Sequence, residues 1–339
     1  MQTHDKILLG HGSGGKLMHE LIEKVFLKHF NDPLLLDQSD SAVMEVSESR
    51  LAFTTDAYVV QPMFFAGGNI GKLAVCGAVN DLVAAGAQPL FLSVAFIIEE
   101  GLELSELEII VQTMAETASD AGVRIVCGDT KVVGKGQCDK LFITTSGIGQ
   151  TQKEHEDIGS GKLIQPGDHI IINGTLGDHG MAVLAARNQL GFTSDLQSDC
   201  APLNLMIQPL LDAGLPIHFM RDPTRGGLAS VLCEITQNKN FGIEIDETLI
   251  PISEPVLGMC ELYGFDPLYI ANEGKMLMIV PDSSSFETLS LLQKSESGKN
   301  SAAIGRVTEK NPGRVMMKTP IGGTRLITML TGEQLPRIC

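Results

Sequence analysis

The 339-residue sequence has no hydrophobic run long enough to cross a membrane, which takes about 20 apolar residues. Its longest apolar stretch, PLFLSVAFII at residues 89–98, has the length of a buried strand. The first residues, MQTHDKILLGHGSGG, also lack the apolar core of a signal peptide. We therefore expect a cytoplasmic protein with no membrane partner.

Positive charge is scarce as well. The chain has 25 Lys and Arg residues against 41 Asp and Glu residues, which gives a formal net charge of −16. Such a field repels nucleic acid and anionic lipid, so we expect neither as a partner. A few Lys or Arg side chains can still form a local anion site within it.

The seven cysteines are scattered and form no CxxC pair. This pattern excludes a disulfide framework and a zinc site, and it favours a reducing compartment. Most of the cysteines lie in apolar company, as Cys233 does in LASVLCEI, and are expected to be small buried side chains. Cys339 is different, because it ends the polar sequence GEQLPRIC.

The length predicts two domains, and the order of apolar segments agrees. Strands and helices alternate from about residue 38 to 150, then again from His169 to near residue 318, with a polar Gly- and Pro-containing linker between them. In the first part we expect helices at 15–30, at 69–86 with Asn69 as cap, and at 105–122 with a Ser105–Glu108 capping box, and strands at 41–49, 50–60, 88–98, 123–133 and 139–149.

Two glycine-rich segments raise the question of phosphate binding. GHGSGGKL at residues 10–17 has the glycine and lysine spacing of a P-loop, but Leu17 stands where magnesium needs Ser or Thr, so we reject a P-loop. The loop can still cradle phosphate with its N–H groups, or it can be a flexible leader. NGTLGDHGMAV, residues 173–183, is a second possible phosphate turn, although a tight turn before a helix is the simpler interpretation.

Isolated acidic residues are the stronger signal. Asp81 lies in KLAVCGAVNDLVAAGA, a helix that is apolar on every side, where a carboxylate is costly unless it is paired or metal-bound. Asp56 and Asp129 each end an apolar strand, as acids that hold Mg²⁺ and phosphates do, although Asp also favours turns. Lys131, two residues after Asp129, is either a phosphate ligand or ordinary surface.

Two further segments carry acids at the ends of apolar stretches. RDPTRGG places Asp222 beside Arg225 and a double glycine, which suits a nucleotide with Mg²⁺, or else makes Asp222 a helix cap. NEGK places Glu273 at a strand junction, as a general base or as part of a turn. No His pair or Ser-His-Asp pattern accompanies these acids. The residues alone therefore indicate an enzyme that uses Mg²⁺·ATP without a P-loop.

Eight segments together resemble the HypE family of hydrogenase maturation proteins, which is part of the superfamily of aminoimidazole ribonucleotide synthetase and selenophosphate synthetase. They extend from about His11 to Cys339, and the terminal PRIC is the most diagnostic of them. The segments are HGSGGK, TTDAYVVQPMFF, GGNIGKLAVCGAVNDLVAAGAQPLFLSVAFIIEEG, GDTKVV, NGTLGDHG, RDPTRGG, NEGK and GEQLPRIC.

The resemblance implies an α+β (mixed α/β), two-domain PurM-like architecture. Residues 1–37 would form a glycine-rich arm and helix, and residues 38–151 an ATP-binding domain whose sheet dimerises into a barrel. Residues 152–318 would form an α/β sandwich, and residues 319–339 a mobile tail that carries Cys339. Fully extended, the 17 residues after Gly322 span about 55 Å, so such an arm could visit other proteins.

The resemblance also implies a reaction. A HypF-type carbamoyltransferase would load a carbamoyl group onto Cys339, and this chain would dehydrate it to a thiocyanate with ATP. The cyanide would then pass to iron on a HypC–HypD scaffold for [NiFe]-hydrogenase. By matching motifs, the catalytic residues would be Cys339, Glu273 and Lys131, the ATP-binding residues Asp56, Asp81, Asp129, Asp222, Asn80, Arg225, Gly12, Gly14 and Gly15, and the Mg²⁺ ligands Asp56, Asp81 and Asp222.

Three other functions remain to be weighed against this one. A selenophosphate synthetase would carry a Cys or selenocysteine in the glycine loop, and HGSGGK has none. Another ATP-dependent, amide-activating enzyme of the superfamily would not need the tail. A non-enzymatic thiol carrier would not need the isolated acids. ATP hydrolysis that depends on Cys339 would separate the thiol carrier from a dehydratase, since a carrier hydrolyses none.

Overall fold

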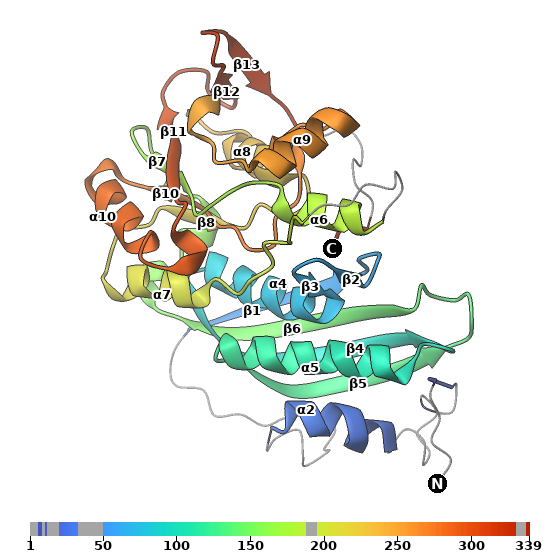
Figure 1. The fold of residues 1–339 in the computed structure, drawn as a ribbon. Helices are drawn as coiled ribbons and strands as arrows, with labels where there is room; N and C mark the ends of the chain where they lie inside the picture. The colour runs from blue at the N-terminus through green and yellow to red at the C-terminus, as the bar shows by residue number, and fades with distance from the viewer. Residues whose placement is uncertain (1–5, 9–10, 12–19, 33–49, 188–194, 330–336) are drawn as a thin grey trace.

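The computed structural model describes residues 6–8, 11, 20–32, 50–187, 195–329 and 337–339, which fold into two lobes in contact (Figure 1). In the N-terminal lobe, two short helices precede a sheet with two longer helices. The elements of this lobe are η2 (Ile22–Leu27), α2 (Lys28–Phe30), β1 (Arg50–Tyr58), β2 (Phe64–Phe65), β3 (Gly68–Asn69), α4 (Ile70–Ala84), β4 (Ala87–Glu99), α5 (Leu104–Asp120), β5 (Arg124–Val133) and β6 (Leu141–Thr151).

The N-terminal sheet has the strand order β1-β6-β4-β5. Strands β4 and β5 are parallel, whereas β6 pairs antiparallel with both β1 and β4. Helices α4 and α5 cover one face of this sheet. On the opposite face Leu51, Phe53 and Ile97 are exposed, with Phe53 70% accessible. Large apolar side chains on an uncovered sheet face indicate an interaction surface.

Helix α4 lies between the N-terminal sheet and the C-terminal lobe (Figure 1). This position explains why its sequence is apolar on every side, since it packs on β1, β4 and β6 below and on α7 (Asn204–Asp212) above. The predicted cap is confirmed, because the Asn69 side chain accepts hydrogen bonds from the N–H groups of Gly71 and Lys72.

The C-terminal lobe contains a seven-stranded sheet in the order β13-β12-β9-β11-β7-β10-β8. Its strands are β7 (His169–Ile172), β8 (Phe219–Arg221), β9 (Gly242–Asp246), β10 (Leu277–Val280), β11 (Ala302–Thr308), β12 (Val315–Lys318) and β13 (Thr324–Ile327). Besides α7, its helices are α6 (Asp178–Ala186), α8 (Gly227–Thr236), α9 (Glu254–Tyr263), α10 (Asp282–Leu292) and the short η3 (Lys153–His155), η4 (Ile158–Ser160), η5 (Glu247–Leu249), η6 (Pro267–Tyr269) and η7 (Glu296–Gly298).

The main hydrophobic core is shared by the two lobes. Leu73 and Val79 of α4 belong to the same buried cluster as Met278 of β10 and Ile207 of α7. On the other face of the C-terminal sheet, β7 and β10 pack with α8 in a second cluster. The two lobes are therefore held in a fixed arrangement by apolar packing, which gives residues at their junction fixed relative positions.

Several sequence expectations need correction. Ser105 lies inside α5, whose N-cap is Glu103 without a side-chain bond, so the predicted capping box is wrong. The predicted linker contains η3 and η4, with Ile158 buried. The predicted tail begins too early, because β13 pairs with β12. The predicted strand at 41–49 lies outside the described residues.

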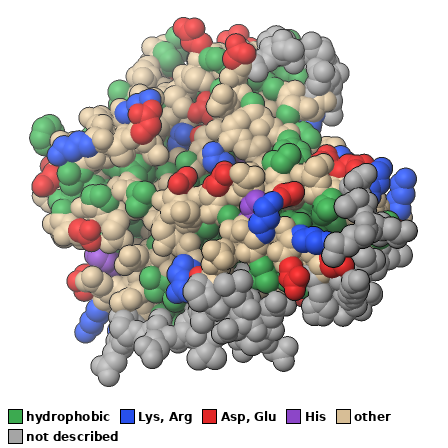
Figure 2. Space-filling model, turned by 60° about the horizontal axis from the view of Figure 1, so that its bottom comes forward, with side chains coloured by type: hydrophobic (Ala, Val, Ile, Leu, Met, Phe, Trp, Pro, Cys, Tyr) green, Lys and Arg blue, Asp and Glu red, His purple; other side chains and the backbone are tan. Residues whose placement is uncertain are grey.

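Among the residues that the structure describes, no helix is long and apolar enough to cross a membrane. On the face shown in Figure 2, basic side chains are scattered among acidic and hydrophobic ones and form no continuous basic patch.

Candidate active site

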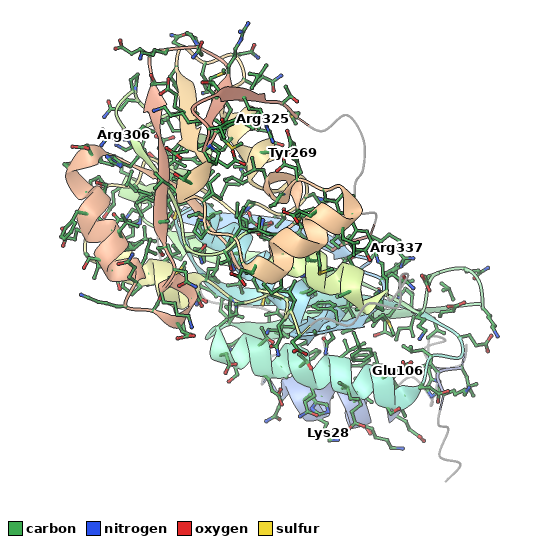
Figure 3. The ribbon with its side chains drawn as sticks, turned by 45° about the horizontal axis from the view of Figure 1, so that its top comes forward. Lys28, Glu106, Tyr269, Arg306, Arg325 and Arg337 are labelled. Atoms are coloured by element: carbon green, nitrogen blue, oxygen red, sulfur yellow. The ribbon has the colours of Figure 1, made fainter. Side chains whose placement is uncertain are left out.

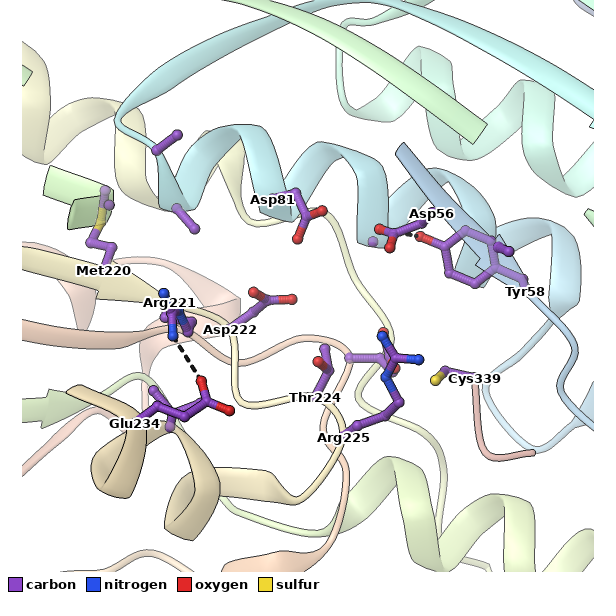
Figure 4. A pocket seen from close by; sticks show the side chains of 17 residues that line it. Asp56, Tyr58, Asp81, Met220, Arg221, Asp222, Thr224, Arg225, Glu234 and Cys339 are labelled. Atoms are coloured by element: carbon purple, nitrogen blue, oxygen red, sulfur yellow. Dashed lines mark hydrogen bonds and ion pairs between the residues drawn. The ribbon is translucent and has the colours of Figure 1, made fainter. Parts of the chain in front are cut away.

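A pocket of about 570 Å³ opens between α4 of the N-terminal lobe and the loop that follows β8 in the C-terminal lobe. Its volume is in the range of small-molecule and cofactor sites. Asp56 and Asp81 line one wall, and Asp222 lines the other (Figure 4). The chemistry of its lining is dominated by carboxylates, with Arg225, Tyr58, Glu273 and Cys339 among the other lining residues.

Asp81 is one of two adjacent polar residues, with Asn80, in the apolar part of α4. Its Oδ2 accepts a hydrogen bond of 2.6 Å from Thr54 Oγ1 on β1. Burial, then the charges of Asp222 and Asp56, raise the pKa of Asp81 from 3.8 to about 7. A carboxylate kept in such surroundings binds a proton or a cation tightly, so the expectation that Asp81 is functional is supported by its electrostatics.

Asp56 lies two residues before Tyr58 on β1, on the face of the strand that packs against α4. The Tyr58 hydroxyl donates to Asp56 Oδ2 at 3.2 Å. Burial and the nearby charge of Asp56 raise the pKa of Tyr58 well above its ordinary value, so this hydroxyl stays protonated and remains a donor. Gly77 of α4 makes room for the ring, because a Cβ there would lie 2.1 Å from the Tyr58 hydroxyl oxygen.

Asp222 lies in the loop between β8 and α8. The alternative that it caps a helix is not realised, since the N-cap of α8 is Gly226. Gly226 and Gly227 have φ values of 75° and 59°, which turn the chain sharply and leave Asp222 facing the pocket. Burial, then the charge of Asp56, raise the pKa of Asp222 to about 6.

Asn272 fixes this loop, a role that sequence reasoning missed. It is fully buried, and its Nδ2 donates to the Pro223 carbonyl at 2.9 Å. Its Oδ1 accepts from the Gly177 N–H at 2.7 Å. The asparagine of NEGK is therefore a positioning residue. The sequence shows it only as part of a turn, because its partners lie about 50 and 95 residues away.

Glu273 is only 3% exposed, and its Oε1 has no hydrogen-bond partner among the described residues. Its main chain is held by Asp199, whose Oδ1 accepts from the Glu273 N–H at 3.1 Å, and by Asn80, whose Nδ2 donates to the Glu273 carbonyl at 3.2 Å. Burial, then the neighbouring Cys200 and Asp222, raise the pKa of Glu273 well above its ordinary value. Its oxygens are thus strong proton acceptors.

A buried ion pair lies behind Glu273 and was also missed from the sequence. Lys275 Nζ is 2.9 Å from Asp199 Oδ2, and both side chains are less than 10% exposed. Burial opposes the charge of Asp199, but the charge of Lys275 outweighs it and holds the pKa of this carboxyl below its usual value. Asp199 is therefore charged while it supports the Glu273 main chain. The lysine of NEGK was the available signal, and its partner could not be guessed.

Cys339 enters this pocket as part of the segment 337–339. A main-chain oxygen of Cys339 accepts from the Val59 N–H at 3.1 Å, and Ile338 is buried in the main core. The Cys339 side chain lines the pocket, as does that of Arg225 (Figure 4). The structure thus brings Cys339 together with Asp56, Asp81, Asp222, Glu273 and Arg225.

Other candidate residues are not in the pocket. Asp129 and Lys131 pair with each other at 2.9 Å on an exposed part of β5, with side chains 57% and 64% accessible. Asn80 is buried, and its amide is committed to main-chain groups of Ala201, Leu203 and Glu273, so its role here is positioning rather than the predicted cofactor contact. Gly12, Gly14 and Gly15 lie outside the described residues.

The second glycine segment forms a tight turn. The N–H groups of Leu176, Gly177 and Gly180 already donate to Pro251, Asn272 and Ala271, which leaves them unavailable for a phosphate. Asp178, at the start of α6, accepts from Thr175 and Ser253 and faces Lys275. The simpler interpretation of NGTLGDHG is therefore the one that fits.

The predicted Mg²⁺ ligands do not form a complete metal site by themselves. Within the described part of the chain, no three His, Cys, Asp or Glu side chains come close enough together to hold a metal ion by themselves. The Asp56, Asp81 and Asp222 carboxylates line the same pocket, but they do not converge on one position. A cation here would need further ligands from a bound molecule.

The two lobes correspond to two family models. Residues 38–151 match the AIR synthase related protein N-terminal domain, and residues 165–318 match the AIR synthase related protein C-terminal domain. Solved structures of low identity share this architecture, among them the thiamine monophosphate kinase of Aquifex aeolicus, with 20% identity and a TM-score of 0.57. The fold and the acidic pocket between the lobes define an AIR synthase related protein.

More similar relatives narrow this class. The carbamoyl dehydratase HypE of Rhodobacter capsulatus is 49% identical over 99% of this chain and 98% of its own length. The HypE of Escherichia coli is 43% identical over 99% of this chain and all of its own length. The chain belongs to the HypE family of carbamoyl dehydratases.

Solved HypE structures have the same fold. A HypE crystal structure in complex with ATP has 45% sequence identity and a TM-score of 0.93, covering 98% of this chain and 99% of that one. HypE in a HypE–HypF complex has 45% identity and a TM-score of 0.79, covering 91% and 99%.

Proposed function

We propose that the chain dehydrates an S-carbamoyl group on its own Cys339 to a thiocyanate at the expense of ATP, and so supplies cyanide for the iron of [NiFe]-hydrogenase. One observation carries the proposal. The sulfur-bearing residue lies in the same pocket as three aspartates and the buried Glu273, and burial raises the pKa values of two of these aspartates, Asp81 and Asp222. A substrate carried on this sulfur is therefore already at the site.

The chemistry needs ATP because an amide oxygen is a poor leaving group. The carbamoyl oxygen attacks the γ-phosphorus of ATP, ADP leaves, and one N–H proton is lost to give an S-bound imidate phosphate. The second N–H proton then goes to a base while the C–O bond breaks and phosphate leaves, which forms S–C≡N. The sum is loss of one water from the carbamoyl group, with ATP converted to ADP and phosphate. Positioning and charge neutralisation are what the protein must supply.

The acidic walls support Mg²⁺·ATP binding. Asp56, Asp81 and Asp222 would hold the magnesium together with phosphate oxygens, which fits carboxylates that share a pocket without converging on one point. The magnesium supplies charge neutralisation on the transferring phosphoryl group. Arg225 lines the same pocket and gives a donor for the phosphates.

Glu273 is the proposed base. Its side chain is buried against the pocket, Oε1 has no partner among the described residues, and its pKa is raised. Asn80 and Asp199 hold its main chain, so its carboxyl group is positioned without being neutralised by a cation of its own. These are the properties of a group that takes an N–H proton.

The uncovered sheet face supports the proposed homodimer. Phe53 and Ile97 are exposed there, and Asp129 and Lys131 lie on the neighbouring strand β5. A second copy that covers this face would bring Lys131 and Asp129 to the interface. Their predicted contributions to ATP binding and catalysis depend on that dimer.

The proposed partners follow from the chemistry. A HypF-type carbamoyltransferase loads the sulfur, and an iron-bearing HypC–HypD scaffold accepts the cyanide, so the segment 337–339 must leave the pocket twice in each cycle. The seven free cysteines support a reducing, cytoplasmic location.

ADP release in a single turnover tests this function. Chains loaded with carbamoyl groups should release about one ADP per loaded Cys339, in the stoichiometry of the reaction above. The Cys339→Ala variant should release none above background. Equal ATP turnover in the two chains would instead indicate an enzyme that activates a free amide.

A further inference from the structure

His179 is the buried residue that contacts the main chain of the docked segment. It lies in the first turn of α6, within the DHG of NGTLGDHG, and is fully buried. Its Nε2 is 2.8 Å from the carbonyl oxygen of Ile338. Its Nδ1 is 2.8 Å from Ser198 Oγ, and its ring makes a T-shaped contact with that of Phe65. Every polar atom of this imidazole is therefore used.

The hydrogen bonds assign a single tautomer. A carbonyl can only accept, so Nε2 carries the hydrogen and donates to Ile338. Ser198 Oγ accepts from the Cys200 N–H at 3.1 Å and can direct its own hydrogen to Nδ1. Burial lowers the pKa of His179, which keeps the ring neutral in this arrangement. The chain Cys200–Ser198–His179 thus aims one N–H at the segment that carries Cys339.

Arg187, at the end of the same helix, makes the second contact of this kind. Its Nη2 donates to the Arg337 carbonyl at 2.9 Å, and its Nε donates to the Gln61 carbonyl at 2.8 Å. The Arg337 side chain lies between α6 and the turn that joins β5 to β6 (Figure 3), where it pairs with Asp139. The α6 contacts reach main-chain atoms, which are the same whatever group the sulfur carries.

Residues 59–61 complete the contact surface from the other lobe. The N–H groups of Val59 and Gln61 donate to main-chain oxygens of Cys339 and Arg337 at 3.1 and 3.2 Å, in the alternation of a short strand pair. The carbonyl of Ile338, between them, faces the opposite way, toward His179. Each of the three residues of the segment therefore has a main-chain oxygen with a donor, and that of Ile338 depends on one side chain.

We propose that His179 is a positioning residue that holds residues 337–339 in the active-site pocket by its hydrogen bond to the Ile338 carbonyl. The strength of this hydrogen bond sets the equilibrium between the docked and undocked states of the segment. The effect on turnover rests on the dehydratase function proposed above, whereas the docking itself does not. Loosening this contact makes Cys339 more accessible to a loading partner and less available for dehydration. The two steps therefore respond in opposite directions.

Two substitutions separate the hydrogen bond from the ring. His179→Phe keeps an aromatic ring against Phe65 but removes the N–H donor, and it leaves the Ile338 carbonyl unpaired. His179→Gln places an amide N–H near the position of Nε2 and should restore the contact. The readout is the rate at which iodoacetamide alkylates Cys339, measured by mass spectrometry of its peptide in full-length protein without nucleotide.

We expect Cys339 to be alkylated about five- to tenfold faster in His179→Phe than in the wild type, because the loss of a buried hydrogen bond shifts the docking equilibrium by about that factor. His179→Gln should lie within about twofold of the wild type. His218→Gln is the matched control, since His218 bonds Asp168 in the C-terminal lobe and has no contact with the segment. It should leave Cys339 alkylation unchanged even if it lowers the melting temperature.

The proposal would be overturned if Cys339 were alkylated in His179→Phe at the wild-type rate, or if alkylation were as fast in His179→Gln as in His179→Phe. A second measurement follows carbamoyl loading and dehydration in single turnovers. The proposal predicts faster or equal loading with slower dehydration in His179→Phe, whereas a general loss of structure would slow both and contradict it. Failure of dehydration in the wild type would refute the proposed function, while the alkylation result would still decide the role of His179.

Discussion

Asp81 on α4 and Asp222 after β8 face the same pocket from opposite lobes, and the charge of Asp222 contributes, after burial, to raising the pKa of Asp81 to about 7. Two carboxylates so arranged destabilise the empty pocket and stabilise whatever cation enters it. This relation links stability, pH and ligand binding in the chain.

Replacement of Asp81 should reveal the cost of that charge. Its folded-state pKa is raised, so the folded chain binds the proton more tightly than the unfolded one. Its contribution to stability is present in full below about pH 4 and is lost as the pH rises through about 7. Asp81→Asn should raise the free energy of unfolding by about 1–3 kcal/mol at pH 8 and change it little at pH 4.5. Urea denaturation at both pH values measures this, and equal effects at the two would contradict it.

Removal of Asp222 should weaken nucleotide binding through the metal. Asp222→Asn is expected to weaken Mg²⁺·ATP binding at least about tenfold in isothermal titration calorimetry. The control is Asp120→Asn at the exposed end of α5, which should bind as the wild type does. Mg²⁺·ATP binding displaces protons from the carboxyl groups whose pKa values are raised. The affinity of the wild type for Mg²⁺·ATP should therefore also be higher at pH 8 than at pH 5.5. Unaltered affinity in Asp222→Asn would remove this residue from the site.

Glu273 should matter for chemistry rather than for binding. Glu273→Gln keeps the shape of the side chain and removes its basicity, so dehydration of loaded Cys339 should slow by about 100-fold or more. ATP affinity should stay within about threefold of the wild type, because no contact to ATP is assigned to this group. Since the base must be deprotonated and its pKa is raised, the wild-type rate should increase with pH. A pH-independent rate would argue for another base.

The apolar sheet face should form the dimer interface. Phe53→Glu places a charge on the face of β1 where Phe53 is 70% exposed, and it should convert a dimer into a monomer in sedimentation velocity. Ile109→Glu, on α5 with 52% exposure on the other side of the sheet, is the matched control and should leave the dimer intact. A dimer that survives Phe53→Glu but not Ile109→Glu would place the interface on the helical layer.

Much of this site was predictable from local sequence. An acid in an all-apolar helix and an acid after a strand are expensive placements, and Asp81, Asp56 and Asp222 do lie in one pocket. The cap at Asn69 follows from residues within one turn. These predictions needed only the cost of burying charge and the geometry of one element.

Other features depend on contacts between distant segments. Asn272, Lys275 and His179 gain their roles from partners 49 to 159 residues away, which no local pattern shows. The capping box at Ser105 failed because the helix begins one residue earlier. The predicted tail contains a strand, β13, because β12 offers an edge for pairing, a tertiary effect that overrides a weak local signal.

The most direct test is intact mass spectrometry of the peptide that carries Cys339. The chain is incubated with a HypF-type carbamoyltransferase, carbamoyl phosphate and only as much ATP as loading consumes, so that none remains for dehydration. It is then isolated with its carbamoyl adduct and divided, with Mg²⁺·ATP added to one half only. We predict an adduct on Cys339 that loses the mass of one water only in the half that receives ATP. An unmodified Cys339, with the transferase shown to be active, or an adduct that ATP leaves unchanged, would contradict the account.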